Sequence, residues 1–157
     1  MRALQNLTTG SATIGIGGNA GEGITTGGSN ICIGDQAGAT FDTETDNMFI
    51  GANAGNGPIS GGENNVAIGN NTLDALTSGD DNVVVGYGAG SAITSGGFST
   101  LVGRNAGAAM ATQRITAVGY YAGAASTGNQ NNFFGFNCGS GNTSAVSYTH
   151  LTLPTTD

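Results

Sequence analysis

A short motif recurs along the chain at a nearly constant spacing, and this repeat limits the possible fold more than any other feature. Each copy places an apolar residue directly before a glycine, as in the run NVAIGNNTL from Asn65 to Leu73. The spacings between successive central glycines are 17, 17, 18, 17, 17, 16 and 16 residues. These glycines are Gly17, Gly34, Gly51, Gly69, Gly86, Gly103, Gly119 and Gly135. A fixed period of this length is typical of a solenoid, in which each repeat forms one coil.

Counting each repeat from its central glycine as position 0 reveals columns of similar residues. Position −1 is apolar in every repeat: Ile16, Ile33, Ile50, Ile68, Val85, Val102, Val118 and Phe134. Position −3 is also mostly aliphatic, and residues two apart share one face of a strand, so positions −3 and −1 are predicted to form an inward-facing structural core. A second apolar column lies at position +7, and position +3 is always small. The pattern predicts an all-β fold, a β-solenoid or β-roll of about eight coils of 16–18 residues over residues 1–145.

Position −2 points away from positions −3 and −1 and is therefore predicted to face outward. It is nevertheless apolar in most repeats, with Cys32, Phe49, Val84, Leu101 and Phe133 as its larger members. A long apolar stripe rarely stays exposed on a monomer. We therefore expect position −2 to be the oligomer face of a homotrimer.

The glycines and amides predict local geometry. An invariant glycine at position 0 fits either a positive φ or a close approach between backbones. Asparagine dominates positions −4 and +2, where it could form hydrogen-bonded ladders along the stack or could simply tolerate turn geometry. Both alternatives stay open for each column.

Composition excludes several classes of function. The chain has 30 Gly, 8% charged residues and a formal net charge of −7, which argues against nucleic-acid binding. It has no apolar run long enough to insert into a membrane as a helix. Its single histidine is His150, so we expect no catalytic residues, no cofactor and no enzymatic activity. Cys32 and Cys138 lie six repeats apart, too far for a disulfide in a stacked solenoid, and are predicted to be small packed side chains.

Three weaker binding hypotheses come from exposed positions. Asp46, Glu63 and Asp81 fall at nearly the same turn of successive coils and are candidates for a calcium site, with a solvated turn as the alternative. Position +1 holds Tyr87, Arg104, Tyr120 and Phe136, which could bind a surface glycan or receptor or could pack on one another along the stack. Thr25-Thr26 and Thr94-Ser95 hint at an ice-binding face, although the threonine column is not continuous.

Both ends depart from the repeat. The alignment places Met1 in the middle of a repeat, so we expect the natural protein to extend upstream. Residues 146–157 show no trace of the motif, and VSYTHL resembles a translated sequencing adapter. We therefore expect this tail, with His150 and Asp157, to be non-native and the chain to be a fragment.

The unit NxxIGxxAGxxITTGxxN, over about residues 3 to 143, resembles the repeats of phage tail fibres. It also looks like the head of trimeric autotransporter adhesins, whose SVAIGxxA coils form a trimeric β-roll. The resemblance implies a structural segment of a virion tail fibre, or of an extracellular adhesin at the bacterial surface, that positions binding to a host glycan or protein receptor.

Overall fold

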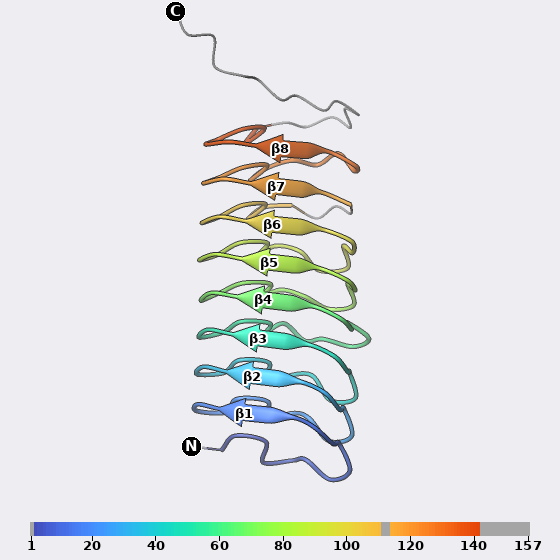
Figure 1. Cartoon of the computed structure of the whole chain (residues 1–157). Helices are drawn as coiled ribbons and strands as arrows, with labels where there is room; N and C mark the ends of the chain where they lie inside the picture. Colours follow the sequence, from blue (N-terminus) through green and yellow to red (C-terminus); the bar gives the residue numbers. More distant parts are fainter. Residues whose placement is uncertain (1, 111–113, 142–157) are drawn as a thin grey trace, which may run out of the picture.

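The chain forms a β-solenoid in which each repeat makes one coil (Figure 1). The computed structural model describes residues 2–110 and 114–141. Each coil contributes one three-residue strand: β1 (Ile14–Ile16), β2 (Ile31–Ile33), β3 (Met48–Ile50), β4 (Val66–Ile68), β5 (Val83–Val85), β6 (Thr100–Val102), β7 (Thr116–Val118) and β8 (Asn132–Phe134). The described residues contain no helix. The all-β solenoid predicted from the repeat is therefore confirmed.

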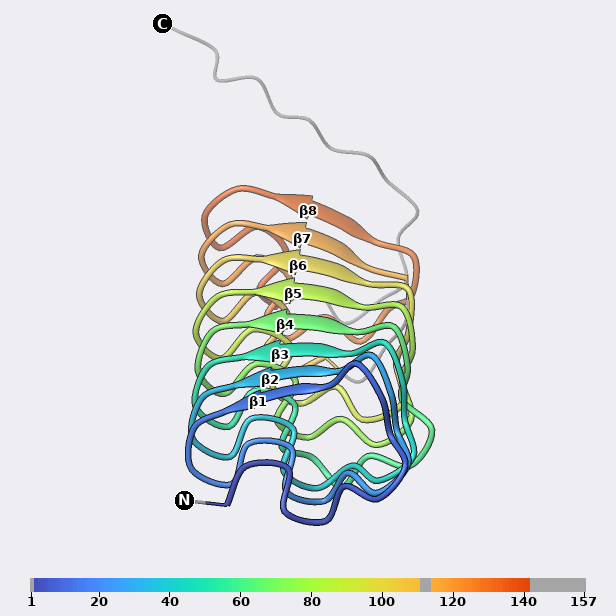
Figure 2. The ribbon, with the colours of Figure 1, turned by 60° about the horizontal axis from the view of Figure 1, so that its bottom comes forward.

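The strands form one parallel sheet in the order β1 to β8, with equivalent residues directly over one another (Figure 2). Ile33 pairs with Ile50, and Ile50 pairs with Ile68, even though the coil between these last two holds one extra residue. The register is therefore set by the motif and not by a constant number of residues. The extra residue is taken up outside the strands, in the loop around Gly57–Gly62.

The predicted direction of the side chains is wrong, and the sheet is turned over relative to the expectation. Position −2 faces the interior, where Phe49, Val84 and Leu101 are fully buried. Position −1, predicted to be the core, faces outward: Ile16 is 59% exposed and Phe134 is 50% exposed. The column of Ile16, Ile33, Ile50, Ile68, Val85, Val102, Val118 and Phe134 is half-buried or exposed in every coil. The proposed oligomer face of Cys32, Phe49, Val84, Leu101 and Phe133 is instead the core.

A physical reason for this orientation lies in the polar residues of the other column. Position −3 includes Thr100, Thr116 and Asn132, whereas position −2 holds no hydrogen-bonding side chain other than the weak donor Cys32 in any coil. An unpaired hydroxyl or amide costs free energy in an apolar interior. Positions −3 and −1 share one face of the strand, so turning that face inward would bury these polar groups, whereas the face of position −2 has none.

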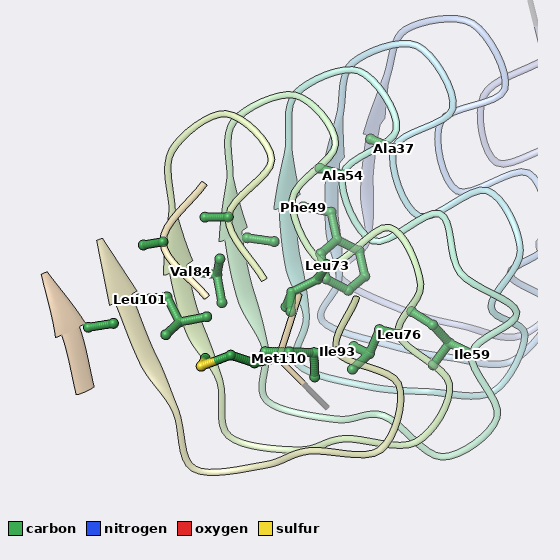
Figure 3. Packing of buried hydrophobic residues seen from close by; sticks show 14 of the residues in the cluster. Ala37, Phe49, Ala54, Ile59, Leu73, Leu76, Val84, Ile93, Leu101 and Met110 are labelled. Carbon is green, nitrogen blue, oxygen red and sulfur yellow. The ribbon is translucent and has the colours of Figure 1, made fainter. Parts of the chain in front are cut away.

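The interior is completed by the opposite wall of the coil. The predicted inward column at position +7 is confirmed, since Ile24, Phe41, Leu76, Ile93 and Met110 are fully buried. Figure 3 shows part of this column meeting the side chains of position −2 across the coil. The rings of Phe41 and Phe49 pack edge to face with their centroids 5.5 Å apart. The alanines at position +3 are also fully buried, as their small size suggested.

The central glycines meet both predicted requirements. Their φ angles lie between 125° and 138°. From Gly17 to Gly119, a Cβ atom would also lie within 2.4–2.8 Å of the next coil's backbone carbonyl oxygen. An L-residue would therefore be strained and would push two coils apart.

The two asparagine columns have different roles. At position +2, Asn19, Asn53, Asn71 and their equivalents have φ angles near 55°, so this column serves turn geometry. At position −4, the buried Asn30, Asn47, Asn65 and Asn82 form a ladder. The backbone N–H of each of the last three donates to the Oδ1 atom of the asparagine one coil before, at 2.9–3.1 Å.

Each amide of this ladder also closes its own coil. The Nδ2 group of Asn65 donates to the carbonyl oxygen of Gly79, and that of Asn82 donates to Gly96, both at 2.9 Å. The ladder continues with Ser99, whose backbone N–H donates to Asn82 Oδ1 and whose hydroxyl accepts from the N–H of Ile115. One residue type therefore joins the beginning of a coil to its end and to the next coil.

We expect Gly86→Ala to destabilise the solenoid more than Gly61→Ala does. Both glycines have positive φ, so each alanine is strained by about 1–3 kcal/mol. At Gly86 the Cβ would also lie 2.5 Å from the Gly103 carbonyl oxygen, whereas at Gly61 nothing lies within 4 Å. Overpacking should add about 1–3 kcal/mol at Gly86. Urea unfolding followed by circular dichroism measures the difference, and equal midpoints would contradict close backbone contact.

We expect Asn65→Ala to cost about 2–5 kcal/mol, because the buried carbonyl of Gly79 and the buried N–H of Asn82 each lose a partner. The control is Asn70→Ala in the same coil. Asn70 is exposed and accepts one hydrogen bond from the N–H of Ala52, so its loss should cost about 0.5–1.5 kcal/mol. Thermal unfolding of both variants compares them, and a similar loss for the two would argue against the ladder.

Candidate functional site: the outer face of the sheet

The outer face of the sheet carries two parallel columns of apolar side chains, at positions −3 and −1. Thirteen of its sixteen residues are apolar, and none is charged. Ile14, Val83 and Val102 are 46%, 41% and 37% exposed. Since the strands are parallel, in register and only three residues long, they present this surface as a continuous narrow strip along the whole stack (Figure 1).

Two further columns border this strip, one on each side of the strands. Position −5 lies just before the strand in a left-handed backbone conformation, with φ near 60° for Asp81, Phe98 and Arg114. Position +1 lies just after the central glycine and holds Tyr87 and Arg104. All five of these side chains are exposed. We call positions −5 and +1 the two borders of the strip.

The residues at position +1 pack on one another along the stack. The guanidinium carbon of Arg104 lies 5.3 Å from the ring centroid of Tyr87. The rings of Tyr120 and Phe136 are stacked at 5.2 Å with an angle of 7° between their planes. These contacts correspond to the packing alternative for this column. Glycan or receptor binding at this column stays a prediction.

The opposite border contains a similar pair. The guanidinium carbon of Arg114 lies 5.7 Å from the ring centroid of Phe98, which is 60% exposed. Sequence reasoning missed this pair because position −5 varies in chemistry from Ala12 to Arg114. Its common property is the left-handed backbone, which spacing alone did not reveal.

Charge is distributed unevenly along the stack. The acidic residues in the described part of the chain all lie between Glu22 and Asp81. Arg104 and Arg114 lie beyond them, in the coils of β6 and β7. The strip itself is uncharged, so charge can act on a partner only through the borders.

The calcium candidates do not form one cluster. The backbone N–H of Asp81 donates to the carbonyl of Glu63, and that of Asn64 donates to Thr45, which places Asn64 in line between Asp46 and Asp81. Asp46 and Asp81 are thus two rungs, or about 10 Å, apart. In the part of the chain that the structure describes, no group of three or more His, Cys, Asp or Glu side chains could hold a metal ion. The predicted shared site is therefore wrong, because the extra residue of this coil moves Glu63 out of line.

A buried carboxylate that sequence reasoning missed has a structural role. Glu44 Oε2 accepts hydrogen bonds from the N–H groups of Asp42 and Thr43, and Oε1 accepts one from Gly61. Gly61 belongs to the loop that holds the extra residue. The available signal was an acid at position +10, where Gly27, Gly79 and Gly96 stand in other coils.

The proposed ice-binding threonines lie outside the strip. Thr26, Thr94 and Ser95 are exposed. The hydroxyl of Thr25 donates to the carboxylate of Asp42, and that of Thr77 donates to the carbonyl of Thr94. Ice binding stays a prediction. The suspected non-native tail, residues 146–157 with His150, lies outside the described residues.

Comparisons with protein-family models, with curated proteins and with solved structures found no match. No helix among the described residues is long and apolar enough to cross a membrane. The case for a function therefore rests on the strip and its borders.

We expect Cys32 to resist a thiol-labelling reagent at pH 8 in the folded protein, while Cys138 reacts. Burial raises the pKa of the Cys32 thiol to about 12, so it stays protonated far above neutral pH, and the thiolate is the reactive form. Cys138 is only partly buried. Counting labelled thiols by mass spectrometry before and after unfolding in urea tests this, with Cys32→Ala as the control. Two labelled thiols in the native protein would show that the column at position −2 is accessible.

Proposed function

We propose that the chain is a structural, non-catalytic segment of a homotrimeric fibre, in which three copies pack the outer faces of their sheets around a common axis. The observation that carries this proposal is the uncharged apolar strip at positions −3 and −1, which a single copy leaves open. Strands that are apolar on both faces are normally covered on both. A long apolar strip rarely stays exposed on a monomeric soluble protein.

The shape of the molecule favours a partner that is equally long and straight. Every coil adds one rung in register, so the strip runs parallel to the solenoid axis without interruption (Figure 2). A second and a third copy have the same rise per coil and can cover the strip over its whole length. Three copies form a closed ring of contacts, which leaves no strip uncovered.

Such an assembly would serve as a stiff rod that holds a receptor-binding part at a distance. The repeat motif resembles those of phage tail fibres, so the virion is the first proposed location. The head of a bacterial trimeric adhesin at the cell surface is the alternative of the same class. In both settings the coils described above supply length and rigidity, and the host glycan or protein receptor supplies specificity.

Light scattering after size exclusion and negative-stain microscopy test the proposal, with rods of three chains expected. We expect Ile33→Glu combined with Ile50→Glu to convert the trimer into folded monomers. Both side chains lie on the strip, so two adjacent carboxylates would be buried in an apolar interface and would repel one another.

The matched control is Thr26→Glu combined with Thr94→Glu, which adds the same charge at exposed positions outside the strip. It should leave the mass of the assembly unchanged, and circular dichroism should show that both variants keep their β-structure. A wild-type protein that is monomeric at micromolar concentration would contradict the proposed function.

A further inference from the structure

In three successive coils, the two borders of the strip carry side chains of matching chemistry. In the coil of β5 the border residues are Asp81 and Tyr87, in that of β6 Phe98 and Arg104, and in that of β7 Arg114 and Tyr120. Each of these three coils thus has a hydrogen-bond acceptor, a cation or an aromatic ring on one border and a suitable partner for it on the other. None of the eight coils carries two charges of the same sign at positions −5 and +1.

The two members of each pair lie on opposite sides of the strand of their own chain. Positions −5 and +1 are six residues apart in sequence, and a three-residue strand lies between them. A strand rises about 3.3 Å per residue, so the strand alone separates the two positions by about 10 Å. Within the chain, Arg104 instead contacts Tyr87 in the coil before it, and Arg114 contacts Phe98. The match across the strip is therefore not explained by contacts inside one solenoid.

We propose that the two borders form the seam between neighbouring copies of this chain, with position +1 of one copy against position −5 of the same coil in the next. This inference rests on the proposed trimeric fibre and specifies how its subunits are oriented. In a closed ring of parallel copies, one edge of each subunit meets the opposite edge of its neighbour at the same height. The occupant of the strip and its borders is then a second copy, in parallel and in register.

The side chains of the coils of β5, β6 and β7 fit this arrangement. The phenol of Tyr87 can donate a hydrogen bond to the carboxylate of Asp81 in the neighbour. Arg104 can lie over the neighbour's Phe98, and Arg114 over the neighbour's Tyr120, as cation–π pairs. Both guanidinium groups are already held against a ring of their own chain, at 5.3 and 5.7 Å. Less side-chain freedom is therefore lost when the seam closes.

The alternative of inverted copies does not preserve these pairs. Turning one copy end to end would place coils of different number at the same height. Only the parallel, in-register arrangement brings Asp81, Phe98 and Arg114 of one copy to the partner from the same coil of the next copy.

Disulfide trapping tests the seam in a background of Cys32→Ala and Cys138→Ala. The matched variant carries Ser29→Cys and Asp35→Cys, which replace the exposed border residues of the coil of β2. A disulfide requires Cα atoms within about 7 Å, so the two new thiols are too far apart to join within one chain. Mild oxidation should give a covalent trimer on a non-reducing denaturing gel.

The control carries Ser29→Cys with Asn70→Cys, whose coils, those of β2 and β4, are two rungs, or about 10 Å, apart in height. It should give little covalent trimer. Light scattering on every variant separates the possible failures. Trimers in solution with no trapping of the matched pair, or with equal trapping of the control, would overturn the seam and leave the fibre proposal standing. Monomers in solution would overturn both.

A double-mutant cycle tests the chemistry of the seam. Arg104→Ala and Phe98→Ala remove side chains that do not pair within one chain, so their effects on the melting temperature of the trimer should be additive without a seam. With the seam, the double variant should lose less than the sum of the two single losses. Arg104→Ala with Ser29→Ala, four coils apart, is the control and should be additive. Additive losses in the Arg104 and Phe98 cycle would overturn the pairing at this level.

Discussion

Backbone hydrogen bonds between residues one repeat apart hold this molecule together, and the glycine at position 0 is what allows them to form at every coil. The N–H of Gly34 donates to the carbonyl of Ile16, that of Gly51 to Ile33, and that of Gly69 to Ile50, at 2.7–2.8 Å. A Cβ at the glycine would occupy the path of the next backbone. Contact between coils therefore selects for the one residue without a side chain, and the visible period of the sequence is a direct consequence.

Once coils stack in register, each interior side chain is confined to the space left by its neighbours. Phe49 is accommodated because Gly55 follows at position +4, where a Cβ would lie 2.7 Å from the ring. In the next coil the arrangement is reversed: Ala67 is small, and position +4 is Leu73, fully buried in a left-handed conformation with φ 48°. Volume is exchanged between two positions of a coil, which explains why position −2 tolerates residues from glycine to phenylalanine.

The period, the parallel register, the small corner residues and the wall at position +7 could all be predicted from sequence, because each depends on a property that repeats in every coil. The direction of the strand side chains could not be predicted by counting apolar residues, since positions −3, −2 and −1 are all rich in them. The informative residues were Thr100, Thr116 and Asn132, three exceptions that exclude position −3 from the interior. Glu44 and Phe98 were missed for a related reason, because each occurs in one coil only. Glu44 is held by hydrogen bonds from backbone N–H groups, and Phe98 by a left-handed backbone.

The reversed sheet changes the surface on which the proposed assembly would form. With positions −3 and −1 inside, as predicted, a single apolar column would have faced outward. With position −2 inside, two columns do so, and every strand contributes two outward side chains for one inward side chain. Over the whole sheet, thirteen apolar side chains therefore lie on the outer face, whereas each strand contributes at most one side chain to the core. The same repetition that makes the solenoid stable also gives the outer face of every copy the same rise per coil.

This shared rise alone would permit copies to slide past one another by whole coils, since the strip is nearly uniform. Side chains that differ from coil to coil are needed to fix the register, and they occur at the borders, where Asp81, Phe98 and Arg114 follow one another on one side and Tyr87, Arg104 and Tyr120 on the other.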